Sequence, residues 1–117
     1  MNVRSELVQQ NLHAIFGEHD AFKRRQRLEA IWHPDGLFID PDGSHHGIDA
    51  IEARVIALQA QFPDFVFSEL GAVQQMHEVA RLGWAYGPAD APRTVTGIDV
   101  AVSRDGKLAA LYAFIDG

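Results

Sequence analysis

Cysteine is absent from the 117-residue sequence, and its absence excludes two kinds of chemistry. The chain can form no disulfide framework and can offer no thiolate as a nucleophile or metal ligand. Long apolar runs are missing too, and the longest ones present are far too short to span a bilayer. The first six residues lack the layout of a signal peptide. We therefore expect a cytoplasmic protein with no membrane partner.

Basic residues are scarce, with 10 lysines and arginines against 16 aspartates and glutamates, for a net charge of −6. An acidic protein binds nucleic acid poorly unless its basic residues are segregated on one face. The one basic cluster, at residues 23–25 and 27, has acids close by at positions 18, 20 and 29. We interpret it as a solvated helix face and expect no nucleic-acid partner.

Hydrophobic residues make up 47% of the chain, which is typical of a globular protein with a substantial core. No repeat, linker or low-complexity segment interrupts it. The length suits a single domain over residues 1–117, large enough to enclose a small cavity.

Three segments in the first half carry apolar residues every three to four positions, which predicts three amphipathic helices. The first covers residues 3–16 and ends at Gly17. The second covers about residues 21–32, with Asp20 as N-cap and an apolar face that includes Phe22. The third covers about residues 48–61 and ends before Pro63.

The remaining segments are typical of strands. Residues 37–40 form a short apolar run, and residues 41–44 have the composition of a turn. Four longer runs follow at residues 65–73, 78–86, 94–103 and 108–115, and Asp105-Gly106 predicts a tight hairpin between the last two. We predict an α+β fold in which three N-terminal helices pack in the concave face of a curved, mostly antiparallel sheet.

Several short motifs carry a resemblance to a known family. They are Trp32-His33-Pro34-Asp35-Gly36-Leu37-Phe38-Ile39-Asp40-Pro41, His46-Gly47 with Ala50-Ile51, Thr96-Gly97-Ile98-Asp99-Val100, and Asp105-Gly106-Lys107-Leu108. In this order they resemble the nuclear transport factor 2-like superfamily, in its SnoaL-like and ketosteroid-isomerase-like branch. The resemblance covers essentially the whole chain and implies a cone-shaped, cystatin-like roll with a mostly apolar pocket. That cone hosts isomerases, cyclases, dehydratases, hydrolases and binding modules, so the resemblance alone does not specify an activity.

The resemblance to ketosteroid isomerases implies that Asp40 occupies the position of the general base. The positions of the two oxyanion donors in those enzymes correspond to Phe16 and Thr96 in this sequence. Phe16 can donate no hydrogen bond, and Thr96 is a weaker donor than a protonated acid. Two further tyrosines that support this site in the isomerases correspond to Trp32 and Val55 in this sequence. Because losing one oxyanion donor reduces the rate by about 10²–10³, we do not expect steroid isomerisation.

Asp40 has two interpretations from the residues themselves. Strand alternation sends Phe38 and Asp40 to one face, which favours a carboxylate facing the pocket as a base. The alternative is a strand-end residue that starts a turn by accepting backbone N–H bonds.

Asp99 lies in an otherwise apolar strand, where a buried acid must be hydrogen-bonded or paired. One interpretation of Asp99 is a second pocket acid whose pKa differs from that of Asp40. The alternative is a structural partner of Arg81 or Trp84, or a residue exposed at an interface. SnoaL-like cyclases carry their base on a late strand, and the resemblance makes Asp99 a candidate for it. The resemblance of Ile98-Asp99-Val100 to the isomerases instead puts Asp99 on the opposite face from Thr96, so whether Asp99 faces the pocket stays open.

The histidines do not predict a metal site. His45 and His46 are adjacent, so a regular element cannot easily direct both at one ion, and no helical His-x-x-x-His pair exists. We expect solvated loop histidines, with His46 alone, close in sequence to Asp40, as a weak catalytic candidate. No metal or other cofactor is expected.

The predicted pocket wall consists of residues that are either core or cavity lining. They are Phe16, Trp32, Phe38, Val55, Leu58, Trp84, Tyr86, Thr96, Leu111 and Ile115. Tyr112 and Phe114 fall on the other face of the last strand, where exposed rings usually mark association. We therefore predict a homodimer through the outer face of the sheet.

Together these patterns favour a protein that binds a small apolar or aromatic carbonyl compound. If it is an enzyme, the expected class is cofactor-free proton transfer, as in an isomerase, an aldol-type cyclase or a dehydratase, with Asp40 as base. The alternatives are a non-catalytic binding module, with Asp40 tied down and the cavity filled, and an interaction module that has no cavity. The space between the third helix and the sheet distinguishes them.

Overall fold

The computed structural model describes residues 3–116 and contains the three predicted helices. Helix α1 (Val3–Gln10) continues into a π-helical segment, η1 (Asn11–Phe16), and is followed by α2 (Ala21–Ile31) and α3 (Ile48–Gln61). Asp20 caps α2 as predicted, because its carboxylate accepts a hydrogen bond from the backbone N–H of Lys23 at 3.0 Å.

Six strands form one sheet in the order β2-β1-β6-β5-β4-β3. Their bounds are β1 (Trp32–Asp40), β2 (Gly43–His46), β3 (Val66–Met76), β4 (Val79–Gly87), β5 (Val95–Arg104) and β6 (Lys107–Ile115). Strands β3 to β6 form an antiparallel meander, and β6 pairs with β1 in parallel. The predicted α+β fold with a mostly antiparallel sheet is confirmed.

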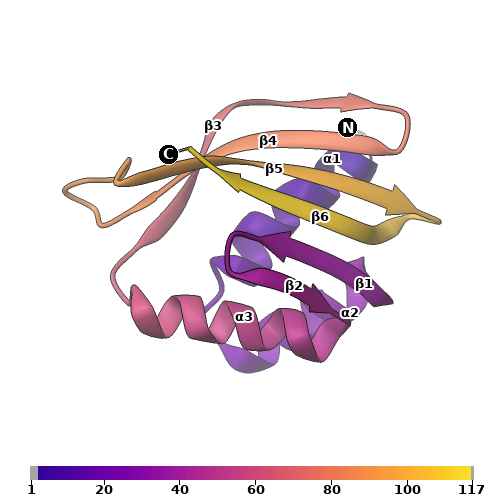
Figure 1. Ribbon diagram of the computed structural model, residues 1–117, viewed down its shortest axis with the longest axis horizontal. Coiled ribbons are helices and arrows are strands. Elements are labelled where there is room, and N and C mark those ends of the chain that lie inside the picture. The colour runs from indigo at the N-terminus through magenta and orange to yellow at the C-terminus, as the bar shows by residue number, and fades with distance from the viewer. Residues whose placement is uncertain (1–2, 117) are drawn as a thin grey trace.

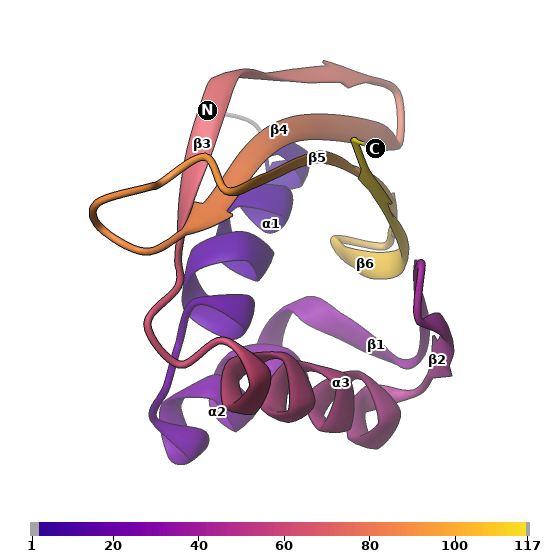
Figure 2. The same cartoon turned by 60° about the vertical axis from the view of Figure 1, so that its left-hand side comes forward.

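The sheet curls around the helices, and its strands run from β3 over one side of the molecule to β2 at the other (Figures 1 and 2). Strand β5 shows how the two faces differ, because Gly97, Asp99, Ala101 and Ser103 are buried while the residues between them are half-buried. The core lies between this concave face and the helices. Its fully buried side chains include Ile15, Leu28, Trp32, Ile51, Val55 and Leu111.

The hairpin between β5 and β6 has the predicted turn chemistry. Asp105 and Gly106 both have positive φ, at 52° and 79°, as the central residues of a type I′ turn require. Glycine tolerates this conformation at no steric cost, and aspartate is among the residues that reach it most readily.

Three local expectations were wrong. The chain turns only at Pro41 and Asp42 and then returns as β2, which pairs with β1, so residues 43–46 are a strand. Strand β1 begins at Trp32, five residues before the strand expected at residues 37–40, and contains a register shift between Trp32 and Leu37. Phe22 is 72% exposed, because the buried face of α2 carries Arg24, Leu28 and Ile31, and position 22 points about half a turn away from it.

The outer face of β6 carries the two rings expected there. Phe114 is 61% exposed and Tyr112 is half-buried, while Leu111 is fully buried on the opposite face. The homodimer through this face stays a prediction. Within residues 3–116, no helix has the length and apolar character needed to cross a membrane.

Candidate functional site

A cavity of about 300 Å³ lies between the helices and the concave face of the sheet. Most of its lining is apolar, and its charged side chains are Asp40, Arg54 and Asp99. This volume is at the lower end of the range of small-molecule sites, about 300–1,000 Å³. The complete lining is Leu12, Phe16, Phe38, Asp40, Arg54, Leu58, Gln61, Phe62, Phe67, Trp84, Tyr86, Val95, Asp99, Ala113 and Ile115.

The periodicity of each element explains which residues reach the cavity. On the strands they are two or four positions apart, as for Phe38 and Asp40 on β1 or Trp84 and Tyr86 on β4. On α3 and at its C-terminal end they are Arg54, Leu58, Gln61 and Phe62, which are three or four positions apart as expected for one face of a helix. The cavity is therefore built from residues far apart in sequence.

Most of the predicted site residues reach the cavity. Asp40 and Asp99 line it, together with six predicted wall residues: Phe16, Phe38, Leu58, Trp84, Tyr86 and Ile115. Trp32, Val55 and Leu111 are instead fully buried in the core and are not part of the lining.

Two predicted residues lie elsewhere. Thr96 is on the outer face of β5, where its hydroxyl donates to the Asp116 carboxylate at 2.7 Å. The His46 ring is exposed, with Nε2 3.1 Å from the carbonyl oxygen of Asp35. The histidine that approaches Asp40 is His45, because the unpredicted strand β2 reverses which of the two faces inward.

Sequence reasoning missed several lining residues, and helix spacing could have found some of them. Arg54 and Phe62 each stand four positions from Leu58, and Leu12 stands four from Phe16. Phe67 pairs with Tyr86 across β3 and β4, and that register is not visible in the sequence. The other missed residues are Gln61, Val95 and Ala113.

Asp40 is held by four hydrogen-bond partners and its side chain is 8% exposed. Arg54 Nε lies 2.7 Å from Oδ2, while His45 Nε2 lies 3.2 Å from Oδ1. The backbone N–H groups of Asp42 and Gly43 also donate to Oδ1, at 3.0 and 3.2 Å. Burial raises the pKa of Asp40, but the bonds from Arg54 and His45 outweigh it and hold the pKa below its ordinary value. A carboxylate stabilised in this way is a weak base.

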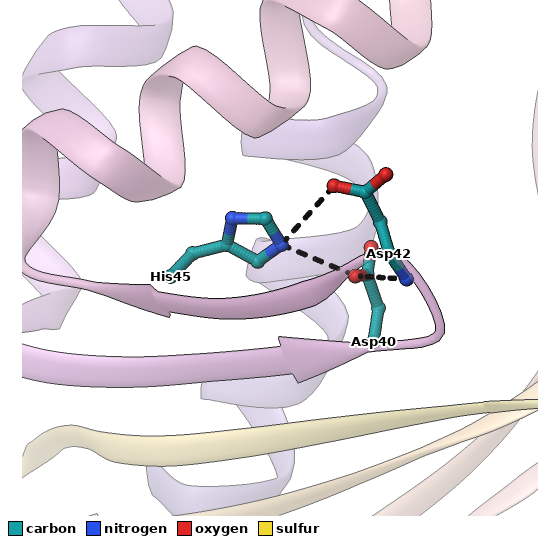
Figure 3. Close-up of side chains that lie close together, drawn as sticks. All are labelled: Asp40, Asp42 and His45. Atoms are coloured by element: carbon teal, nitrogen blue, oxygen red, sulfur yellow. Dashed lines mark hydrogen bonds and ion pairs between the residues drawn. The ribbon is translucent and has the colours of Figure 1, made fainter.

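Figure 3 shows Asp40, Asp42 and His45 directed at one another across the β1–β2 turn. Their potential metal-ligand atoms all lie within 4.8 Å of one another. The Arg54 guanidinium lies against the same two carboxylates, with Nε 2.7 Å from Asp40 and 4.0 Å from Asp42. A metal cation there would face this fixed positive charge and would have to displace it. The cluster therefore fits a cation poorly.

The environment of Asp99 differs from that of Asp40 and shifts the pKa of its carboxyl group in the opposite direction. Asp99 is 5% exposed, and the indole Nε1–H of Trp84 donates to Oδ1 at 2.9 Å. Burial raises the pKa of Asp99 to about 7, against a smaller lowering effect of the Trp84 bond. Within residues 3–116, no other group hydrogen-bonds this carboxyl group. Asp99 is therefore both the Trp84 partner and a second cavity acid, two roles that the sequence left as alternatives.

Gly97 makes the bond between Trp84 and Asp99 possible. It pairs with Trp84 across β4 and β5, and a Cβ at this position would overlap the Trp84 indole and the Phe114 carbonyl oxygen. Without that Cβ the indole lies close against β5, with its Nε1 beside Asp99 two residues along the strand.

A second cavity of about 180 Å³ adjoins the first. Phe16, Phe67 and Tyr86 line both cavities, so these three rings separate them. The Phe67 and Tyr86 rings stack with centroids 4.0 Å apart. Aromatic side chains therefore form part of the boundary that the two cavities share.

Comparisons with known proteins place this architecture in a family. A family model of the SnoaL-like domain matches residues 9–111. A protein from Agrobacterium tumefaciens, described as a candidate isomerase of the SnoaL-like family, is 24% identical with a TM-score of 0.91, and the match covers 100% of both chains. A candidate polyketide cyclase from Sinorhizobium meliloti is 18% identical, with a TM-score of 0.74 over 92% of this chain and 93% of that one.

IdmH, a candidate polyketide cyclase from Streptomyces antibioticus, is 16% identical, with a TM-score of 0.74 over 97% of this chain and 91% of that one. A comparison with curated proteins found no match. At these identities the solved structures establish the fold, and the family model covers most of the sequence. The chain therefore belongs to the SnoaL-like family.

Proposed function

We propose that this protein is a cofactor-independent enzyme that moves a proton on a small apolar or aromatic carbonyl compound, with Asp99 as the general base. The observation that carries this proposal is the contrast between two carboxyl groups that line one cavity. The pKa of Asp40 is lowered by its partners, and the pKa of Asp99 is raised by burial to about 7. Environments that separate two pKa values in this way are a mark of acid–base sites.

The proposed step uses the ionised form of Asp99. Its carboxylate takes a proton from the carbon next to the substrate carbonyl, the C–H electron pair forms a C=C bond, and the carbonyl π electrons move onto oxygen. The protonated Asp99 then returns the proton to the same or another carbon. A base with a pKa near the working pH combines an adequate ionised fraction with sufficient basicity. The Trp84 N–H on Oδ1 fixes the carboxylate orientation.

This assignment replaces Asp40 as the proposed base. Asp40 keeps its carboxylate ionised through Arg54 and backbone N–H groups, which is the arrangement expected of a structural strand-end residue. The relatives described as an isomerase and as polyketide cyclases are compatible with carbonyl chemistry in the same fold.

The second candidate is a binding module without chemistry. The observation that favours it is Asp40 itself, since this alternative expected an acid tied down by arginine and backbone. The binding-module alternative also predicts an interior filled by side chains, whereas the structure contains a cavity of about 300 Å³. An interaction module without a cavity has less support for the same reason.

Proton exchange with solvent distinguishes the two candidates without knowledge of the product. The wild-type protein is incubated in D₂O with 2-tetralone, and deuterium uptake is followed by mass spectrometry. We expect exchange above the solvent rate, with a rate that rises with pH to a plateau and has its midpoint near 7. Asp99→Asn should reduce the protein-dependent rate by about 10²–10⁴-fold.

The matched control is Asp90→Asn, which removes an exposed carboxylate in the loop between β4 and β5. It should exchange like the wild type. If 2-tetralone binds and exchanges no faster than in buffer, the binding module is the correct function. If Asp99→Asn exchanges as fast as the wild type, Asp99 is not the base.

A further inference from the structure

Proton removal next to a carbonyl needs a donor for the oxygen that becomes negative, and the positions expected to supply one do not. Phe16 lines the cavity but has no polar atom, and Thr96 lies on the outer face of the sheet. The Trp84 N–H is already bonded to Asp99, and His46 is outside the lining. The donors must therefore come from other residues of the cavity.

Tyr86 supplies a hydroxyl group with no acceptor. Its ring is 5% exposed and is fixed by stacking on Phe67 and by an edge contact with Phe65, with centroids 4.0 and 5.0 Å away. Within residues 3–116, no group hydrogen-bonds the Tyr86 hydroxyl, although the side chain lines both cavities. Burial raises its pKa, so the phenol keeps its proton at neutral pH and is a donor. A buried phenol usually finds a partner, and a ligand oxygen would provide one.

Arg54 supplies further donors to the same cavity. Among the described residues its guanidinium is hydrogen-bonded through Nε alone, to Asp40, which leaves both Nη groups without an acceptor. Arg54 and Tyr86 line the same cavity, and the positive charge of Arg54 lowers the pKa of Tyr86 against the larger effect of burial. The ion pair with Asp40 holds the guanidinium in place.

From this juxtaposition we infer that the Tyr86 hydroxyl and the Arg54 guanidinium form the oxyanion site of the cavity. The inference rests on the proposed function and adds the orientation of the substrate, with its carbonyl oxygen toward β4 and α3 and its acidic carbon toward Asp99. When Asp99 takes the proton, the electrons that reach the oxygen are stabilised by hydrogen bonds from both groups. Asp40 is then a positioning residue, because it acts through Arg54.

A phenolate binds such a site without undergoing any reaction, which allows a direct test. The probe is 4-nitrophenol, whose ionised form absorbs visible light, and the background is Asp99→Asn, which removes the titrating carboxyl group from the cavity. An apolar cavity alone raises the pKa of the bound probe, whereas donors at its oxygen lower it. We expect the bound probe to have a pKa below that of the free probe.

Adding Tyr86→Phe should weaken phenolate binding on the order of 100-fold. Arg54→Lys should weaken it too, because an ammonium cannot keep the planar fork that contacts Asp40 and the ligand together. The matched control is Tyr112→Phe, which removes the other tyrosine hydroxyl of the chain, on the outer face of β6. In the Asp99→Asn background, Tyr112→Phe should leave the affinity for the phenolate unchanged.

Equal phenolate affinities for the Tyr86→Phe and Tyr112→Phe proteins would overturn the inference, as would a bound probe whose pKa is raised. The outcome is separable from the proposed function, because the probe has no carbon acid and the base is replaced. Missing D₂O exchange together with a Tyr86-dependent phenolate site would overturn proton transfer and leave the oxyanion site standing. Exchange that requires Asp99 but not Tyr86 would overturn the oxyanion site alone.

Discussion

Replacing Asp99 with asparagine should make the protein more stable, and by an amount that depends on pH. Asparagine has the same shape, and its side-chain oxygen can accept the Trp84 N–H as Asp99 does. What it lacks is a charge that the buried site must accommodate once the pH rises. The comparison therefore isolates the free energy of ionising Asp99 in the folded protein.

The sign and size of the effect follow from the two pKa values. The unfolded chain releases this proton near the ordinary value of 3.8, and the folded protein releases it near 7. Between these values the folded state binds more protons, so the stability of the wild type falls as the pH rises and levels off above 7. At about 1.4 kcal/mol for each pH unit, the full difference is about 4 kcal/mol.

The assay is urea unfolding of the wild type and Asp99→Asn from pH 4 to pH 8. The stability advantage of Asp99→Asn should be smallest at pH 4 and should grow by about 4 kcal/mol by pH 8, equivalent to roughly 10–20 °C in Tm. Other titrating groups cancel because both proteins contain them. Asp90→Asn, the exposed control, should follow the wild type. A difference that stays constant over this range would refute the raised pKa and the mechanism built on it.

Three further predictions concern the neighbours of Asp99 and the wall of the cavity. Trp84→Phe removes the donor that lowers the pKa of Asp99. In the same urea series, the free energy of unfolding of this variant should therefore keep falling up to a higher pH than that of the wild type. Gly97→Ala places a methyl group where the Trp84 indole lies, and it should destabilise the fold by about 1–3 kcal/mol in urea. Phe67→Ala removes a ring that separates the two cavities, so calorimetry should show a gain in affinity for the three-ring ketone anthrone relative to 2-tetralone. An unchanged ratio would show that Phe67 does not limit ligand length.

The elements that the sequence predicted well are those with local causes. Helix α3 follows from a regular three-to-four spacing, and the β5–β6 hairpin follows from Asp105-Gly106. In both cases the signal and the structure lie within one segment. Strand β2 was missed because it has four residues and no hydrophobic pattern, and it forms only by pairing with β1.

The roles of the two acids depended on contacts across the sheet and the helices. Asp40 lines the cavity, but its partner Arg54 comes from α3 and lowers its basicity. Asp99 became the stronger candidate because burial raises its pKa to about 7, and Trp84 from β4 reaches its carboxyl group over Gly97. The sequence offered Trp84 as one possible partner of Asp99 and gave no sign of Arg54 beside Asp40, since both contacts depend on the register and packing of separate elements.

The ionisation of Asp99 can be measured directly by ¹³C NMR of the aspartate carboxyl carbons, with Asp99→Asn and Asp40→Asn used to assign the signals. We predict that the Asp99 signal titrates with a midpoint near 7, while the Asp40 signal titrates below 3.8. Midpoints in the reverse order, or an Asp99 carboxyl group that is ionised at pH 5, would contradict the assignment of Asp99 as the base.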